Sequence, residues 1–152
     1  MMKPEWLAGR KESVIVTPHQ LEFERLFGRS VDQLGVEEKE QAVQEMARTY
    51  QCVILLKAVD DIISDGDQII RVIGGNQGLT KGGTGDVLAG LVLALYAKNN
   101  PVISTVVASV LEKTAADRLF ETKGHWYNVA DLINTIPEVL KDLVYNKDRG
   151  QS

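Results

Sequence analysis

The feature that most constrains this chain is a glycine-rich run at residues 74–86, with six glycines among thirteen residues. Each glycine inside a helix or strand would cost about 0.5–1 kcal/mol, so this run is not the interior of either element. It predicts a loop that needs unusual dihedral angles or a close approach of its backbone to another group. The apolar pattern that begins at Val87 predicts a helix directly after the loop.

Short β-branched runs alternate with amphipathic segments along the rest of the chain. The pattern predicts strands at residues 13–17, 52–57, 62–64 and 68–73, the last two joined as a hairpin. It predicts helices at residues 20–27, 36–51, 87–95, 101–123, 129–134 and 137–144. Strands that alternate with helices indicate an α/β layer architecture.

Length, charge and cysteine content exclude several classes of protein. A chain of 152 residues suits one domain, and a net charge of −4 argues against nucleic acid or an anionic membrane as partner. No apolar stretch approaches the roughly 18 residues that span a bilayer, and the first residues lack the apolar segment of a signal peptide. The single cysteine, Cys52, sits in an apolar run and is expected to be a small buried side chain. Without a second cysteine no internal disulfide forms, which predicts a cytoplasmic protein.

Two segments are almost wholly apolar, the predicted helices at residues 87–95 and 101–123. Four short strands offer too little sheet surface to cover both helices. We therefore expect that further strands belong to the same domain and that the chain by itself exposes an apolar patch.

The end of the glycine run carries the strongest chemical signal. Gly82, Gly83 and Gly85 precede a helix, so their backbone N–H groups and the positive end of the helix dipole form a site for a phosphate group. Asp86 would lie in the first turn, where its carboxylate could take the proton from an attacking hydroxyl. The alternative interpretation of the same residues is an ordinary helix cap after a flexible loop.

Four segments resemble the ADP- or ATP-dependent NAD(P)H-hydrate dehydratases of the ribokinase-like superfamily. Residues 82–90 resemble the Gly-x-Gly-Asp motif of that superfamily, and residues 17–26 are similar to the Thr-Pro-His-x-x-Glu-Phe-x-x-Leu segment of the dehydratases. Residues 57–66 and 128–137 resemble their strand-and-turn segment and their closing segment. The resemblance implies a three-layer α/β/α fold of the ribokinase type, truncated at its N-terminus, so that residues 1–152 form the C-terminal part of one domain.

The resemblance also assigns roles to residues. It implies that Asp86 is the catalytic residue and contacts the hydrate, together with His19. It implies that Glu22 organises Mg²⁺ through water, although Glu22 could equally be a favourable first-turn carboxylate and His19 a polar residue at a helix start. Lys81 could reach a phosphate or be a solvated loop lysine. The adenine nucleotide, ADP or ATP, is expected to contact Lys57, Ala58, Val59, Asp60, Asp61, Gly82, Gly83, Thr84 and Gly85.

The implied reaction is the repair of NADH or NADPH that has added water across a ring double bond. The enzymes of this family phosphorylate the hydroxyl at C6 and then eliminate phosphate. Ala58 stands where the family usually has glycine, so its Cβ could crowd the nucleotide. Because the resemblance covers only the family's second half, we expect a homo-oligomer or a separate N-terminal half to complete the enzyme. A vitamin kinase of the same superfamily, for hydroxyethylthiazole, pyridoxal or hydroxymethylpyrimidine, and a non-catalytic fragment remain the alternatives.

Overall fold

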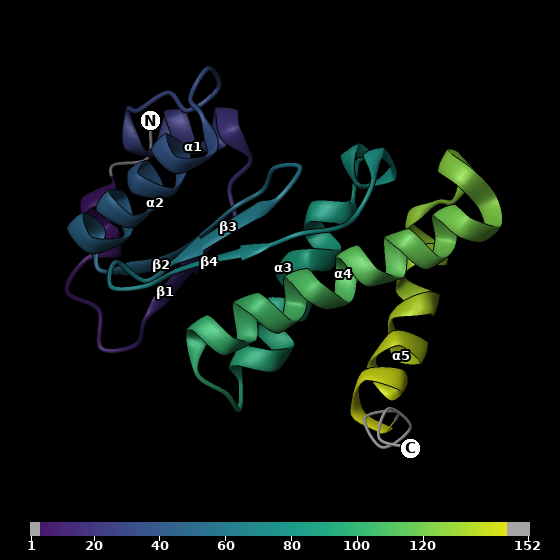
Figure 1. The fold of residues 1–152 in the computed structure, drawn as a ribbon. Helices are drawn as coiled ribbons and strands as arrows, with labels where there is room; N and C mark the ends of the chain where they lie inside the picture. The colour runs from purple at the N-terminus through teal and green to yellow at the C-terminus, as the bar shows by residue number, and fades with distance from the viewer. Residues whose placement is uncertain (1–3, 146–152) are drawn as a thin grey trace, which may run out of the picture.

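The computed structural model describes residues 4–145, which form a four-stranded sheet with helices on both faces (Figure 1). The sheet order is β1-β2-β3-β4, with β1 parallel to β2 and the other neighbours antiparallel. The strands are β1 (Val14–Val16), β2 (Cys52–Leu56), β3 (Asp61–Ser64) and β4 (Ile69–Val72). The helices are α1 (Gln20–Phe27), α2 (Val36–Tyr50), α3 (Thr84–Tyr96), α4 (Pro101–Lys123) and α5 (Val129–Tyr145), with short 3₁₀ turns at Pro4–Leu7, Gln77–Thr80 and Gly124–Trp126.

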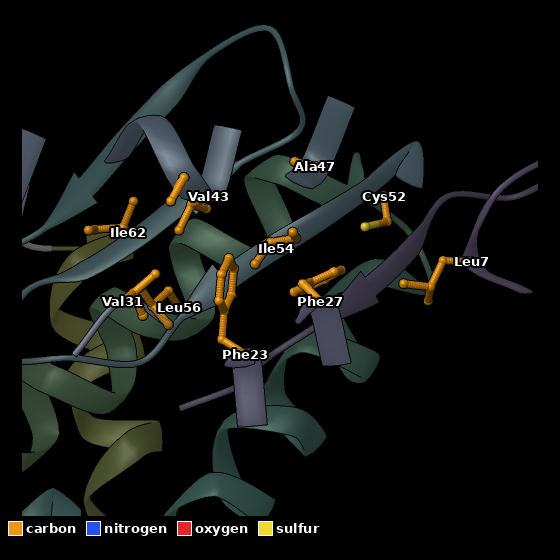
Figure 2. Packing of buried hydrophobic residues seen from close by; sticks show 11 residues of the cluster. Leu7, Phe23, Phe27, Val31, Val43, Ala47, Cys52, Ile54, Leu56 and Ile62 are labelled. Atoms are coloured by element: carbon orange, nitrogen blue, oxygen red, sulfur yellow. The ribbon is translucent and has the colours of Figure 1, made fainter. Parts of the chain in front are cut away.

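Strand β2 is the centre of the three layers because its alternate side chains enter two different cores. Cys52, Ile54 and Leu56 pack against helices α1 and α2, where Phe23 and Phe27 complete the cluster (Figure 2). The other face of β2 packs against α3 and α4 in a second buried cluster. Side chains that alternate between two apolar cores make a strand apolar throughout, as the sequence of β2 is. The α/β prediction is confirmed, and Cys52 is buried as expected.

Capping residues place several helix ends where the sequence predicted them. His19 caps α1, and Gly28 ends it in the left-handed conformation at φ 69°. The side chain of Asn100 accepts hydrogen bonds from the first amides of α4, and Pro101 opens that helix. Gly124 follows the last residue of α4.

Two helix predictions were wrong in their bounds. Helix α3 begins at Thr84 rather than at Val87, so the loop is shorter and Gly85 and Asp86 are helical. The two predicted C-terminal helices form one helix, α5, with Pro137 inside it. Leu132, Ile136 and Val139 lie on one buried face on both sides of the proline, and packing of that face outweighs one lost backbone hydrogen bond.

The sheet has an open edge at β1, and the helices below it are partly uncovered. β1 pairs only with β2 among residues 4–145, and its three residues are half-buried. On α3 and α4, Leu93 is 71 % exposed and Ile103 is 57 % exposed. Both side chains are apolar and exposed, and the expected apolar patch stays a prediction. No helix within residues 4–145 is long and apolar enough to cross a membrane.

Candidate functional site

A cleft of about 1080 Å³ opens where the parallel strands β1 and β2 end. The parallel pairing continues past both strands as far as His19 and Lys57, and Lys57 N–H donates to the Pro18 carbonyl at 2.8 Å. In α/β sheets, ligands bind in the crevice beyond the carboxyl ends of such strands. The glycine-rich loop and helix α4 supply the other walls of the cleft.

The N-terminus of α3 presents unpaired amides to this cleft. Gly83 caps the helix with φ 95°, a conformation that favours glycine, and the first helical hydrogen bond runs from Val87 N–H to the Gly83 carbonyl at 3.1 Å. The first-turn amides of Gly85 and Asp86 therefore have no acceptor within their own helix. A Cβ on Gly85 would lie 2.9 Å from Lys57 Nζ, so the ammonium group stands directly beside this turn. Unpaired amides and an ammonium group are groups that favour a bound anion, so this turn fits the predicted anion site.

Asp86 lies in the first turn of α3, exposed and lining the cleft. It is the third residue of the helix, in the same turn as the amides described above. That arrangement suits a base acting on a hydroxyl that attacks a bound phosphoryl group.

His19 and Glu22 form a reciprocal cap at the start of α1. Glu22 N–H donates to His19 Nδ1 at 3.2 Å, and His19 N–H donates to Glu22 Oε2 at 2.8 Å. Glu22 also lies 3.9 Å from Lys57 Nζ. Both residues therefore cap helix α1, which is the structural role that the sequence allowed for them. Both side chains are also about half exposed and line the cleft, so capping leaves them accessible to a ligand.

Thr84 and Lys81 line the cleft, and their side chains also hold the loop in place. The Thr84 hydroxyl, buried, donates to the carbonyls of Leu79 at 2.7 Å and Lys81 at 2.9 Å. Lys81 Nζ donates to the carbonyls of His125 and Tyr127 and lies 4.4 Å from the centre of the Tyr127 ring. Lys81 therefore joins the loop to the segment between α4 and α5, which neither interpretation of its sequence position anticipated.

Asp61 begins β3 behind the cleft and is almost fully buried, at 4 % exposure. Its Oδ1 accepts from Ala58 N–H at 3.2 Å, and its Oδ2 accepts from the Ser109 hydroxyl at 2.7 Å. Lys113 Nζ lies 3.6 Å from Oδ1. Burial raises the pKa of Asp61, while Lys113 and these hydrogen bonds oppose the rise. Both oxygens of Asp61 thus have protein partners, and its contact with a nucleotide stays a prediction.

Helix α4 contributes two charged residues that the sequence analysis did not single out, Glu112 and Lys113. Lys113, 4 % exposed, donates to the carbonyls of Val59 at 2.8 Å and Gly74 at 3.0 Å, so it ties the β2–β3 turn to the glycine loop. Glu112 is 5 % exposed and lines the cleft. They are the first charged residues of α4, but Asp117, Arg118, Glu121 and Lys123 follow on the same helix, so the sequence does not distinguish these two as buried.

The structure brings eleven of the twelve proposed site residues to this one cleft. They come from the start of α1, the turn after β2 and the N-terminus of α3. Asp60 is the exception, since it does not line the cleft. The eleven are His19, Glu22, Lys57, Ala58, Val59, Asp61, Gly82, Gly83, Thr84, Gly85 and Asp86.

Sequence comparison identifies the family. The model of the NAD(P)H-hydrate dehydratase family matches residues 2–138. The chain belongs to this family. It is 39 % identical over 126 residues to a bifunctional NAD(P)H-hydrate repair enzyme of Archaeoglobus fulgidus, covering 83 % of this chain and 25 % of that protein. It is 35 % identical over 131 residues to an ADP-dependent (S)-NAD(P)H-hydrate dehydratase of Cenarchaeum symbiosum, covering 86 % of this chain and 45 % of that protein.

Solved structures share the architecture of this family member. The ADP/ATP-dependent NAD(P)H-hydrate dehydratase of Bacillus subtilis, crystallised with ATP and Mg²⁺, matches 89 % of the chain with a TM-score of 0.78 and 31 % identity. The chain spans 53 % of that structure. A hydroxyethylthiazole kinase from Pyrococcus horikoshii matches with a TM-score of 0.71 at 23 % identity, which shows a shared fold only. The ribokinase-like fold class is therefore confirmed, and the vitamin-kinase alternative gains no support beyond the fold.

Proposed function

We propose that this chain takes part in the nucleotide-dependent dehydration of hydrated NADH or NADPH. The observation that carries the proposal is the cleft in which the unpaired amides of α3, the Lys57 ammonium group and the Asp86 carboxylate meet. Two dehydratases named above use ADP, or ADP and ATP, according to their names. The cleft supplies an anion site and a base side by side, which phosphorylation of a hydroxyl requires.

In the proposed reaction, the C6 hydroxyl oxygen of the hydrate attacks the terminal phosphorus of ADP or ATP. Asp86 takes the hydroxyl proton, and the bond from phosphorus to the donor oxygen breaks, releasing the shortened nucleotide. The first-turn amides of α3 and Lys57 stabilise the negative charge on the transferred group. The ring nitrogen then expels phosphate from C6, and loss of a proton from C5 restores the double bond.

The residues of the cleft fit a magnesium ion held mainly by the nucleotide. Within residues 4–145 no group of three or more histidine, cysteine, aspartate or glutamate side chains could hold a metal alone. Mg²⁺ needs only one or two carboxylates when it also binds phosphate oxygens and water, and Glu22 and Asp86 both line the cleft. When bound, the ion neutralises charge on the donor phosphates. Glu22 would hold it through water.

We further propose that another chain extends the sheet at β1, either a second copy or a separate N-terminal half. Within residues 4–145 the outer edge of β1 has no partner strand, and this edge and the exposed Leu93 on α3 support the proposal. A strand added beside β1 would also cover the open side of the cleft at His19 and exclude water from it. A cytoplasmic setting fits the single buried thiol of Cys52.

The test is a dehydration assay. The purified chain is mixed with NADH hydrate, Mg²⁺ and either ADP or ATP, and recovery of NADH absorbance is followed. We expect recovery that requires the nucleotide, and the comparison of ADP with ATP identifies the donor. Light scattering on the same sample gives the mass in solution. If the expected assembly forms and neither nucleotide restores NADH absorbance, the proposed reaction is refuted. If a monomer is fully active, the proposed partner is refuted.

A further inference from the structure

Strands β3 and β4 separate at the edge of the cleft. Their last opposed pair at this end is Asp61 and Val72. The same register would next bring Val59 opposite Gly74, two residues further along each segment, but no backbone hydrogen bond joins these segments within residues 4–145. Val59 and Gly74 both line the cleft. The two walls of the cleft at this point are therefore separate segments, and hydrogen bonds of the sheet do not set the distance between them.

The ammonium group of Lys113 joins the two segments where the strand pairing stops. Lys113 Nζ donates to the carbonyls of Val59 at 2.8 Å and Gly74 at 3.0 Å, and it lies 3.6 Å from Asp61 Oδ1. An ammonium group has three N–H donors, so these three oxygens can use all of them. Lys113 is also buried, at 4 % exposure. Its effect on a ligand therefore comes through the two walls that it joins.

Helix α4 holds the start of the glycine loop by further contacts beside that bridge. A Cβ on Gly75 would lie 3.1 Å from Lys113 Cγ, so the lysine stem packs directly against this glycine. One turn further along α4, Asp117 Oδ2 accepts from Gly75 N–H at 2.9 Å. The glycine loop is thus fixed to α4, and Lys113 connects the β2–β3 turn to the same helix.

Stability alone does not account for an ammonium group at this position. Taking a lysine and a carboxylate out of water costs free energy that their attraction often fails to recover, so apolar side chains of similar volume commonly stabilise a core as well or better. Buried charged groups can instead fix one arrangement among several that an apolar core would allow. The arrangement that Lys113 fixes is the opening between the β2–β3 turn and the glycine loop.

We propose that Lys113 is a positioning residue that fixes the opening of the nucleotide cleft before the nucleotide binds. This inference rests on the proposed function, because it assumes that ADP or ATP occupies the cleft. Without the bridge, the segments at Val59 and Gly74 move independently and must be ordered when the nucleotide binds, which lowers its affinity.

The test variant is Lys113→Met, which keeps an apolar stem and removes all three donors. Its matched control is Ser109→Ala, because the Ser109 hydroxyl donates to the same buried carboxylate, at 2.7 Å from Asp61 Oδ2, and its removal leaves the bonds from Lys113 to the walls in place. Calorimetry with ADP, at one fixed Mg²⁺ concentration, measures the dissociation constant for each full chain. We expect ADP to bind roughly tenfold more weakly to Lys113→Met, the size of effect expected when one or two residues must be ordered on binding. Ser109→Ala should bind ADP as the unmodified protein does.

A loss of stability by itself does not produce this result. The apparent affinity falls only with the fraction of protein that is competent to bind, so a variant that is about 90 % folded loses only about a tenth of its affinity. Urea unfolding at the temperature of the calorimetry gives that fraction. If Lys113→Met is largely unfolded, the double variant Asp61→Asn with Lys113→Met is compared with Asp61→Asn alone, since the pair removes the bridge without leaving an unpaired buried carboxylate.

Hydrogen exchange without nucleotide tests the bridge itself. Amides in residues 73–77 should exchange faster in Lys113→Met than in the unmodified protein, because the Gly75 amide keeps its bond to Asp117 only while the loop lies against α4. Ser109→Ala should leave this exchange unchanged.

The outcomes separate this inference from the proposed function. Unchanged ADP affinity in folded Lys113→Met, or equal weakening in Ser109→Ala, refutes the positioning role while the nucleotide site stands. If the unmodified chain binds no ADP, the nucleotide site itself is refuted, and the role of Lys113 in binding with it. Faster exchange in Lys113→Met would then still show that the lysine joins the two walls.

Discussion

Replacing Glu112 by glutamine should make the protein more stable at alkaline pH but not at acidic pH. The ordinary pKa of a glutamate is 4.5, and burial raises that of Glu112 to about 8 in the folded protein. Between these two values the folded protein keeps a proton that the unfolded chain has lost. The free energy of unfolding therefore falls as pH rises from 4.5 to about 8 and is level above that. Glutamine is neutral in both states and removes this loss.

The size of the effect follows from the shift in pKa. At about 1.4 kcal/mol for each pKa unit, a rise from 4.5 to about 8 sets an upper limit of about 5 kcal/mol. Water in the cleft can solvate the ionised carboxylate, so we expect a gain of about 2 kcal/mol above pH 8. Below pH 4.5 the amide and the protonated carboxyl have the same shape and charge, and the two proteins should be about equally stable.

Urea unfolding without nucleotide, at pH 4.5, 6.5 and 8.5, measures the difference between Glu112→Gln and the unmodified protein. Glu121→Gln, exposed on the same helix, controls for the general effect of removing one negative charge. A stability gain that is the same at all three pH values, or that Glu121→Gln reproduces, would show that Glu112 does not keep its proton in the folded state.

Three further substitutions test the site and its support. Asp86→Asn should keep the fold and lower the dehydration rate by at least about 10²-fold, as expected for removal of a positioned base. Near-normal turnover would exclude Asp86 as that base. Gly85→Val should weaken binding of ADP and ATP in calorimetry. The new Cβ would lie 2.9 Å from Lys57 Nζ, so the valine side chain would displace the ammonium group and cover the first-turn amides. Unchanged affinity would mean that this turn binds no phosphate. Lys113→Met should lower the unfolding free energy by about 3 kcal/mol, since it leaves the buried Asp61 without its cation, and a loss under about 1 kcal/mol would count against that pairing.

Local sequence signals predicted most elements because the fold agrees with them. Helix α1 has the predicted bounds because His19 and Gly28 fix its two ends by local hydrogen bonds and by φ. The hairpin of β3 and β4 forms around the predicted Asp65-Gly66-Asp67 turn, where Asp65 Oδ1 accepts from the amides of Asp67 and Gln68 at 3.0 Å each. Interactions within a few residues are visible in a sequence without knowledge of the fold.

Predictions failed where distant contacts decide the structure. Pro137 is an ordinary helix start in the sequence, but the packing of Leu132 and Ile136 against α4 carries α5 through it. Glu112 and Lys113 resemble a solvated stripe on a helix. They are buried because α4 is covered by α3, by α5 and by the sheet at once, and no local pattern reveals how many neighbours a helix has.

The glycine run itself serves two purposes that the sequence could not separate. Its last part, at Gly83 and Gly85, lines the cleft, and phosphate binding there stays a prediction. Its first part makes room for the protein's own side chains: a Cβ on Gly78 would lie 2.1 Å from the Tyr127 hydroxyl, and one on Gly75 would lie 2.9 Å from Leu79.

These internal contacts fix the loop in place. The Tyr127 hydroxyl donates to Asn76 Oδ1 at 2.8 Å, Asn76 in turn donates to Asp117 at 3.3 Å, and Gly75 N–H donates to the same carboxylate at 2.9 Å. With Lys81 bonded to the carbonyl of Tyr127, both halves of the loop are attached to one tyrosine between α4 and α5. The amides that would receive a phosphate are therefore positioned by packing from the far end of the loop, and a ligand need not order them on binding. This packing is the physical reason that a loop with so many glycines can hold its backbone in one place.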